Sequence, residues 1–143
     1  MPVPRSPRHV QLVAAVAIAM LACTAYAESS SPRGQWIGST QVDGERSSDK
    51  TTLQLGASDA ENTTLLIDTG RACKLRDGSY SAQGEDAWVL RFKPNSGDSV
   101  CERLSQGEFT LRNVGPRKLS VEVRYPDGKG GQLQRSGVLA RYP

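Results

Sequence analysis

Few residues of this 143-residue chain are suited to acid–base or nucleophilic chemistry, and several of those lie near its beginning. The single histidine is His9, and Cys23, one of three cysteines, follows it within the first 27 residues. Beyond residue 27 no histidine remains to activate a serine or to complete a zinc shell, which disfavours a catalytic triad and a zinc site. We therefore expect no metal and no cofactor, and Asp68 is the one catalytic candidate left.

The segment Leu66-Ile67-Asp68-Thr69-Gly70 resembles the hydrophobic-hydrophobic-Asp-Thr-Gly motif of retroviral-type aspartic proteases. That resemblance implies that Asp68 residues from two copies of the chain share a proton and activate a water molecule. Arg71 stands where this family has a small residue, and a cation there works against the shared proton. The alternative is a strand that ends in a turn, in which Asp68 accepts local backbone hydrogen bonds. We favour the turn and expect a protein that is not an enzyme.

The first 27 residues are typical of a bacterial export signal. Two arginines precede an apolar stretch over 10–23, and Ala25-Tyr26-Ala27 supplies the small-x-small pattern of a cleavage site. We predict a signal peptide over 1–27 and a periplasmic or secreted protein. The alternative is a lipobox at 20–23, which would place a lipid anchor on Cys23.

The rest of the chain is predicted to form one domain with a short arm before it. Residues 28–33 are polar and serine-rich and contain a proline, so we expect a flexible arm that can be removed at little cost in stability. Residues 34–143 have the length of one domain. The net charge is +3 with interspersed signs, and no second apolar stretch approaches twenty residues. These features disfavour nucleic acid and a membrane span.

Cys73 and Cys101 are the two cysteines that follow the predicted leader. An even number of cysteines in an exported chain indicates a disulfide. Closing a loop of this length stabilises a domain by roughly 3–4 kcal/mol in the chain-entropy model.

Alternation of apolar and polar residues predicts an all-β domain. Leu119, Val121, Val123 and Tyr125 fall on one face of a strand, and polar residues fall on the other. The short apolar run Leu65-Leu66-Ile67 is typical of a strand covered on both faces. We predict a small antiparallel barrel or sandwich of about eight strands, mostly a meander, and no segment shows sustained helical periodicity. The predicted strands are 35–43, 49–57, 62–68, 71–76, 79–83, 86–94, 99–112 with a break near 105–107, 118–126, and a possible ninth at 132–142.

Gly34-Gln35-Trp36 opens the first predicted strand. This pattern is similar to the Gly-x-Trp that begins the calycin group of barrels, which includes lipocalins, avidins, fatty-acid carriers and bacterial metalloprotease inhibitors. The resemblance implies that Trp36 packs at a barrel end beside an arginine from a late strand, either Arg141 or Arg135. The inhibitors insert an N-terminal arm into a protease cleft, and residues 28–33 are placed similarly.

We expect an exported binding protein that inhibits, or confers immunity against, an exported hydrolase. The expected contacts with this protein partner are five residues of the arm, namely Ser29, Ser30, Ser31, Pro32 and Arg33. The alternative is a calycin-like carrier of a small apolar ligand, although the aromatic residues favour a filled interior. A more remote alternative is the aspartic protease that uses Asp68.

Overall fold

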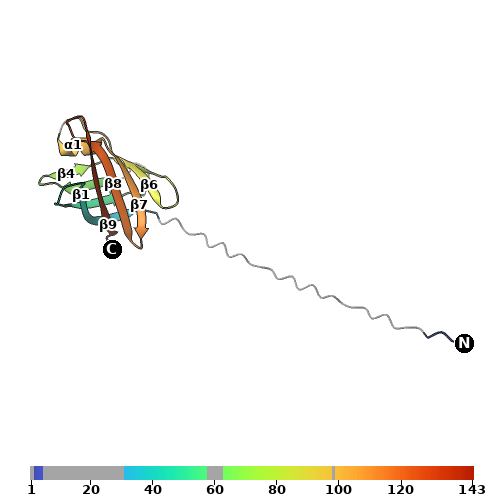
Figure 1. Ribbon diagram of the computed structural model, residues 1–143. Coiled ribbons are helices and arrows are strands. Elements are labelled where there is room, and N and C mark those ends of the chain that lie inside the picture. Colours follow the sequence, from blue (N-terminus) through green and yellow to red (C-terminus); the bar gives the residue numbers. More distant parts are fainter. Residues whose placement is uncertain (1, 5–30, 58–62, 98) are drawn as a thin grey trace.

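The computed structural model describes residues 2–4, 31–57, 63–97 and 99–143. Within these residues nine antiparallel strands form one curled half-barrel sheet, accompanied by one short helix (Figure 1). The elements are β1 Gly34–Val42, β2 Asp49–Leu55, β3 Thr64–Asp68, β4 Ala72–Leu75, β5 Ser79–Ala82, β6 Ala87–Arg91, α1 Val100–Ser105, β7 Glu108–Gly115, β8 Lys118–Pro126 and β9 Gln132–Arg141. The predicted all-β class and the mostly meandering order are confirmed.

Most of the predicted leader and part of the predicted arm lie outside the described residues. This applies to the cleavage site after Ala27, to the lipobox cysteine Cys23, and to Ser29 and Ser30. No helix in the described parts of the chain is long and apolar enough to cross a membrane.

The strands follow the alternation in the sequence. In β8 the side chains of Leu119, Val121, Val123 and Tyr125 are all buried, while every second residue between them faces outward. β3 corrects one expectation, because Leu66 is 40% exposed on the outer face. The sheet encloses its core on one side, and β3 is therefore covered on one face rather than on both.

The sheet curls until its two edges approach each other. The strand order is β4-β3-β2-β1-β9-β8-β7-β6-β5, with antiparallel pairing at every step. Eight antiparallel steps separate β4 from β5, so the two edge strands run in the same direction. They are joined by residues 76–78, which span at most about 14 Å from Leu75 to Ser79. Together, β4 and β5 act as one bent strand that leaves β3 and joins β6.

The bend between β4 and β5 is made by Asp77 and Gly78. Asp77 adopts a positive φ of 54°, which aspartate tolerates better than most residues. The Gly78 N–H donates to the Thr63 carbonyl at 3.1 Å, and a Cβ on Gly78 would lie 2.8 Å from Phe92 Cε1. The close approach of these segments therefore requires glycine at this position.

The interior of the curled sheet is filled by side chains. A contiguous cluster of buried apolar residues runs from Trp36 to Leu139, and Leu53, Leu90 and Leu111 in it have no exposed surface. Filled interiors are typical of barrels of about this strand number.

Helix α1 is a correction to the sequence prediction, which placed a strand over 99–112. Ser99 is the N-cap, and its side chain and that of Glu102 form a reciprocal capping box. Leu104 packs from the helix into the core with no exposed surface. The predicted disulfide between Cys73 and Cys101 is confirmed; it ties α1 to the edge strand β4 across a Cα–Cα distance of 5.3 Å.

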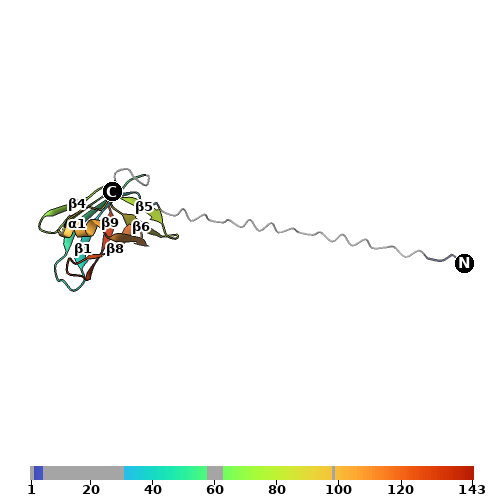
Figure 2. The same ribbon diagram turned by 90° about the horizontal axis from the view of Figure 1, so that it is seen from above.

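The strand directions give the sheet two distinct ends. One end carries α1, the turn 69–71 and the turn 127–131. The other end carries residues 31–33, the loop 83–86, the turn 116–117 and the C-terminal residues. Figure 1 shows the C-terminus at the end opposite α1, and Figure 2 looks from above onto the end with the helix.

Candidate functional site

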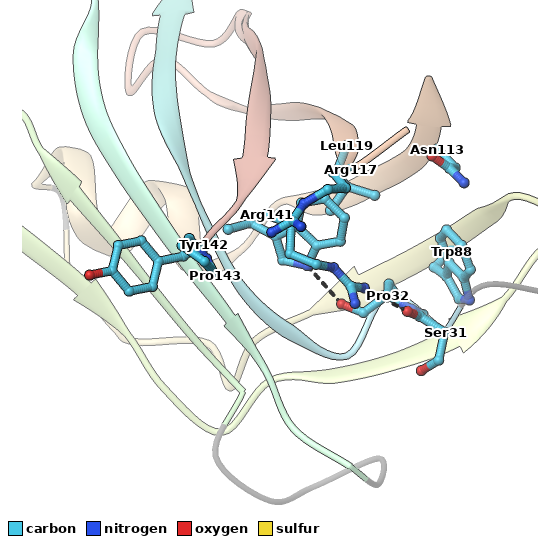
Figure 3. Close-up of a pocket in the computed structure, with 10 residues that line it drawn as sticks. Ser31, Pro32, Trp88, Asn113, Arg117, Leu119, Arg141, Tyr142 and Pro143 are labelled. Atoms are coloured by element: carbon cyan, nitrogen blue, oxygen red, sulfur yellow. Dashed lines mark hydrogen bonds between the residues drawn. The ribbon is translucent and has the colours of Figure 1, made fainter. Parts of the chain in front are cut away.

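A pocket of about 550 Å³ opens at the end of the sheet opposite α1, and we call it the mouth. Ligand pockets commonly measure about 300–1,000 Å³. The residues that line the mouth come from strands far apart in the sequence (Figure 3). The lining residues are Ser31, Pro32, Trp36, Trp88, Asn113, Arg117, Leu119, Arg141, Tyr142 and Pro143.

Trp36 forms the centre of this end of the sheet. Its side chain is 4% exposed, and its indole Nε1–H donates to the Pro32 carbonyl at 2.7 Å. Arg141 lies directly opposite Trp36 in the β1–β9 ladder. The guanidinium carbon of Arg141 stands 4.7 Å from the ring centroid, which is within the range of a cation–π contact. The sequence suggested Arg141 or Arg135 as the arginine that packs beside Trp36, and the structure shows that it is Arg141.

Arg135 occupies a different environment. Its side chain is 3% exposed and pairs with Asp49, with 2.7 Å between Nη1 and Oδ2. The same nitrogen donates to the Thr40 hydroxyl at 3.2 Å. This buried ion pair connects β9 with β1 and β2 inside the sheet and does not line the mouth.

Residues 31–33 are held against the mouth. Pro32 is buried, and the Ser31 carbonyl accepts a hydrogen bond of 2.9 Å from Arg141 Nη2. The Arg33 N–H donates to the Ser31 hydroxyl at 3.3 Å, and Arg33 itself is exposed. The Trp36 indole and the Arg141 guanidinium thus donate hydrogen bonds to the backbone of residues 31–32. This segment, the described part of the predicted arm, forms one wall of the mouth.

Arg117 is the second cation at the mouth. It sits in the two-residue turn between β7 and β8, immediately after Pro116, and its φ is 58°. Its carbonyl accepts a hydrogen bond of 2.9 Å from the Arg141 N–H, which fixes the turn to the end of β9. Its side chain is exposed and makes no hydrogen bond or ion pair with any residue that the structure describes.

Trp88 and Leu119 supply apolar lining. Trp88 is 7% exposed near the start of β6, and Leu119 is 1% exposed near the start of β8. Both tryptophans of the chain therefore line the same pocket. Figure 3 shows that the ring of Tyr142 points away from the other lining residues, so this ring does not face into the mouth.

The side chains that line the mouth are either positively charged or uncharged. Two arginines contribute to its lining, and no acidic side chain is among the described residues that form it. Arg141 is already engaged by Trp36 and Ser31, whereas Arg117 is not engaged by a described side chain. The arrangement can hold an anionic group beside an aromatic or apolar surface.

Asp68 lies outside the mouth. It is exposed at the last position of β3, and the turn that follows has Gly70 at a φ of 87°. In this turn the Thr69 hydroxyl donates to the Arg71 carbonyl at 3.1 Å. The structure thus places Asp68 beside a tight hairpin turn at the end of the sheet that carries α1.

Two carboxylates at the α1 end have lowered pKa values, and both are structural. The pKa of Asp127 is lowered mainly by hydrogen bonds from the backbone N–H groups of Lys129 and Gly131. The pKa of Glu102 is lowered by its hydrogen bonds with Ser99 in the capping box. These groups stabilise a turn and a helix start, and they do not border the mouth.

Of the residues singled out from the sequence, Ser31, Pro32, Trp36 and Arg141 line the mouth and Gly34 does not, while Arg117 and Trp88 were not singled out as site residues. A Gly-Pro pair between two alternating segments, at Gly115-Pro116, is a turn signal that would have located Arg117. No local signal marks Trp88 as part of this pocket, because the curl of the sheet brings it there.

Comparisons of the chain with protein-family models, with curated proteins and with solved structures find no significant match.

Proposed function

We propose that this chain is an exported, non-enzymatic binding protein that acts by masking a protein partner, with an exported hydrolase as the favoured partner class. The observation that carries the proposal is the mouth, a pocket lined by two tryptophans and two arginines at one end of a filled sheet. Tryptophan and arginine are the residues most enriched at the energetic centres of protein interfaces.

The filled interior favours a partner at the end of the sheet over a ligand within it. The core leucines are fully buried, and the floor of the mouth is the top layer of that core, at Trp36 and Leu119. A calycin-like carrier would instead need an interior cavity for its ligand.

A binding role also agrees with the state of the reactive residues. Cys73 and Cys101 are bonded to each other, and Asp68 is exposed at the end of β3, beside a turn. Side-chain contacts hold the mouth in place, as expected of a binding site. Trp36 and Arg141 pack on each other across two strands, and two hydrogen bonds fix the backbone of residues 31–32.

Export is supported by the leader-like composition of the first 27 residues and by the disulfide, which persists in oxidising compartments. We propose that the exported form begins at Glu28. Intact-mass measurement of the exported protein tests this, and a diacylglycerol-modified Cys23 at the N-terminus would contradict it.

A calycin-like relationship is a further part of the proposal. It is supported by Gly34-x-Trp36 at the start of β1, by Arg141 packed on Trp36, and by the meander that brings β9 back to β1. These features concern architecture, and the binding role does not depend on them.

The test is reconstitution of a complex from purified components. The chain from residue 28 is used to capture proteins from the exported fraction, and each captured protein is then purified and mixed with it. We expect a 1:1 complex in light scattering and reduced activity of the partner. Arg117→Trp fills the mouth and should prevent binding. Arg46→Trp lies in the exposed connection 43–48 between β1 and β2, at the α1 end of the sheet, and should not prevent it.

Two outcomes would overturn this function. One is that no captured protein forms a complex when both components are pure. The other is a complex that tolerates Arg117→Trp and fails with Arg46→Trp, which would move the contact to the other end of the sheet.

A further inference from the structure

We infer that the mouth recognises a carboxylate attached to an aromatic or apolar group, with the carboxylate on Arg117 and the apolar group against Trp88 and Trp36. This inference deepens the proposed function and rests on it where it assigns the carboxylate to the partner protein. The same chemistry is offered by a free small carboxylate, and the experiments below separate the two sources.

The first argument is the state of Arg117. A guanidinium forms strong, charge-assisted hydrogen bonds with carboxylates, often through two parallel N–H donors. Arg141, its neighbour in the mouth, already uses its face on Trp36 and a donor on the Ser31 carbonyl. Arg117 has no such engagement with a described residue, so its donors are available to a ligand.

The second argument is the backbone at Arg117. The position after proline in a two-residue turn with positive φ is usually taken by glycine or asparagine, because a Cβ is strained there. This chain places an arginine there, at a φ of 58°. Strained residues of this kind cluster at ligand clamps, where the strain is tolerated for the sake of the side chain.

The third argument is the kind of groups that line the mouth. Arg141 packs on Trp36, so Arg117 is the arginine of the mouth whose side chain is left for a ligand among the described residues. Phosphate carries more charge and is usually held by several backbone N–H groups, as at a helix N-terminus or a glycine-rich loop. The lining offers two tryptophans and two arginines instead, one of them already packed on Trp36, and this set suits a carboxylate with an apolar neighbour.

The two tryptophans make the test direct, because all tryptophan fluorescence of the chain comes from the lining of the mouth. We would titrate the full exported chain with 3-phenylpropionate and, separately, with its neutral analogue 3-phenylpropionamide. The carboxylate should produce a saturable change in fluorescence. The amide should bind at least about tenfold more weakly, which is the difference expected from losing a charge-assisted hydrogen bond.

Variants assign the effect to Arg117. Arg117→Gln should weaken binding of the carboxylate at least about tenfold and leave binding of the amide unchanged. Arg46→Gln, which removes an exposed arginine of the opposite end, should leave both unchanged. Arg117→Gly removes the same charge and also relieves the positive φ, so it should lose carboxylate binding without a lower melting temperature.

The inference fails if the amide binds as tightly as the carboxylate, or if Arg117→Gln binds the carboxylate as the natural chain does. A change in affinity that is accompanied by loss of the folded state in both Arg117 variants would also overturn it, since Arg117 would then be structural.

A competition experiment shows whether the carboxylate belongs to the partner protein or to a free small molecule. It also tests this inference separately from the masking function. A carboxylate on the partner protein predicts that 3-phenylpropionate displaces the captured partner. If the fluorescence titration succeeds and no protein complex can be reconstituted, the chemistry stands, its source is a free small carboxylate, and the masking function fails. If a complex forms and tolerates Arg117→Gln, the function stands and this inference fails.

Discussion

The guanidinium of Arg141 lies over the ring of Trp36, 4.7 Å from its centroid, and the two residues are direct partners in the β1–β9 ladder. This pair joins the first strand of the meander to the last and forms the base of the mouth. It also fixes the N-terminal segment, since the Trp36 indole binds the Pro32 carbonyl and Arg141 binds the Ser31 carbonyl.

Arg141→Ala should lower the free energy of unfolding by about 1–2 kcal/mol. The variant loses a cation–π contact and a hydrogen bond, each of which contributes about 1 kcal/mol. Urea denaturation provides the measurement, with Arg112→Ala on the outer face of β7 as the control. Arg141→Lys should recover part of the loss, because the charge remains. Equal urea midpoints for Arg141→Ala and Arg112→Ala would show that the pair adds nothing to stability.

A chain that begins at Gly34 should be less stable than one that begins at Ser31, by about 1–2 kcal/mol. Removing Ser31 and Pro32 takes away the acceptors of the Trp36 indole and of the Arg141 guanidinium, and it uncovers Trp36. This expectation replaces the one from sequence, in which the whole arm was removable at little cost. Urea midpoints of the two truncated chains provide the comparison, and coincident curves would restore the original view.

Replacing both cysteines, in Cys73→Ser/Cys101→Ser, should lower the stability by about 3–4 kcal/mol. The disulfide closes a loop with a sequence separation of 28, and losing it frees the unfolded chain. It also releases α1 from β4. The double variant should therefore have the same denaturation midpoint as the natural chain treated with reductant. An unchanged midpoint in the variant would mean that the helix is held by its other contacts alone.

The turn at Asp127 should make the domain less stable in acid. Its pKa is lowered in the folded state by backbone hydrogen bonds, so the ionised carboxylate stabilises the fold above its ordinary pKa of 3.8. This contribution is lost as the pH falls through the lowered pKa. Asp127→Asn should therefore differ from the natural chain at about pH 7, and the difference should shrink as the pH falls below the lowered pKa of Asp127. A difference in urea midpoint that stays constant with pH would contradict this role.

The strands were predictable because their signal is local. In β8 the apolar residues Leu119, Val121 and Val123 alternate with polar ones, and this pattern states which face is buried. The disulfide was predictable because two cysteines follow the predicted leader. The error at α1 has a local cause as well: Ser99 and Glu102 have the spacing of a capping box, but the helix of six residues is too short to show a helical period.

The mouth was only partly predictable because it depends on the curl of the sheet. Trp36 and Arg141 were accessible through a resemblance at the start of the first strand. Trp88 and Arg117 belong to β6 and to the β7–β8 turn, and they meet Trp36 only after β9 has paired with β1. The exposure of Leu66 could not be predicted either. The continuous apolar run Leu65-Leu66-Ile67 does not indicate whether a second layer covers the outer face of the sheet.

The central claim is that the mouth is the binding site, and the most direct test is the ¹H–¹⁵N spectrum of the labelled chain with and without its purified partner. The chain has two tryptophans, so its indole region reports on the mouth alone. We predict that the indole signal of Trp88 and the amide signal of Arg117 shift or broaden on binding, while the amides of Val100–Ser105 do not. Unchanged Trp88 and Arg117 signals in a formed complex, with shifts confined to α1, would contradict the claim.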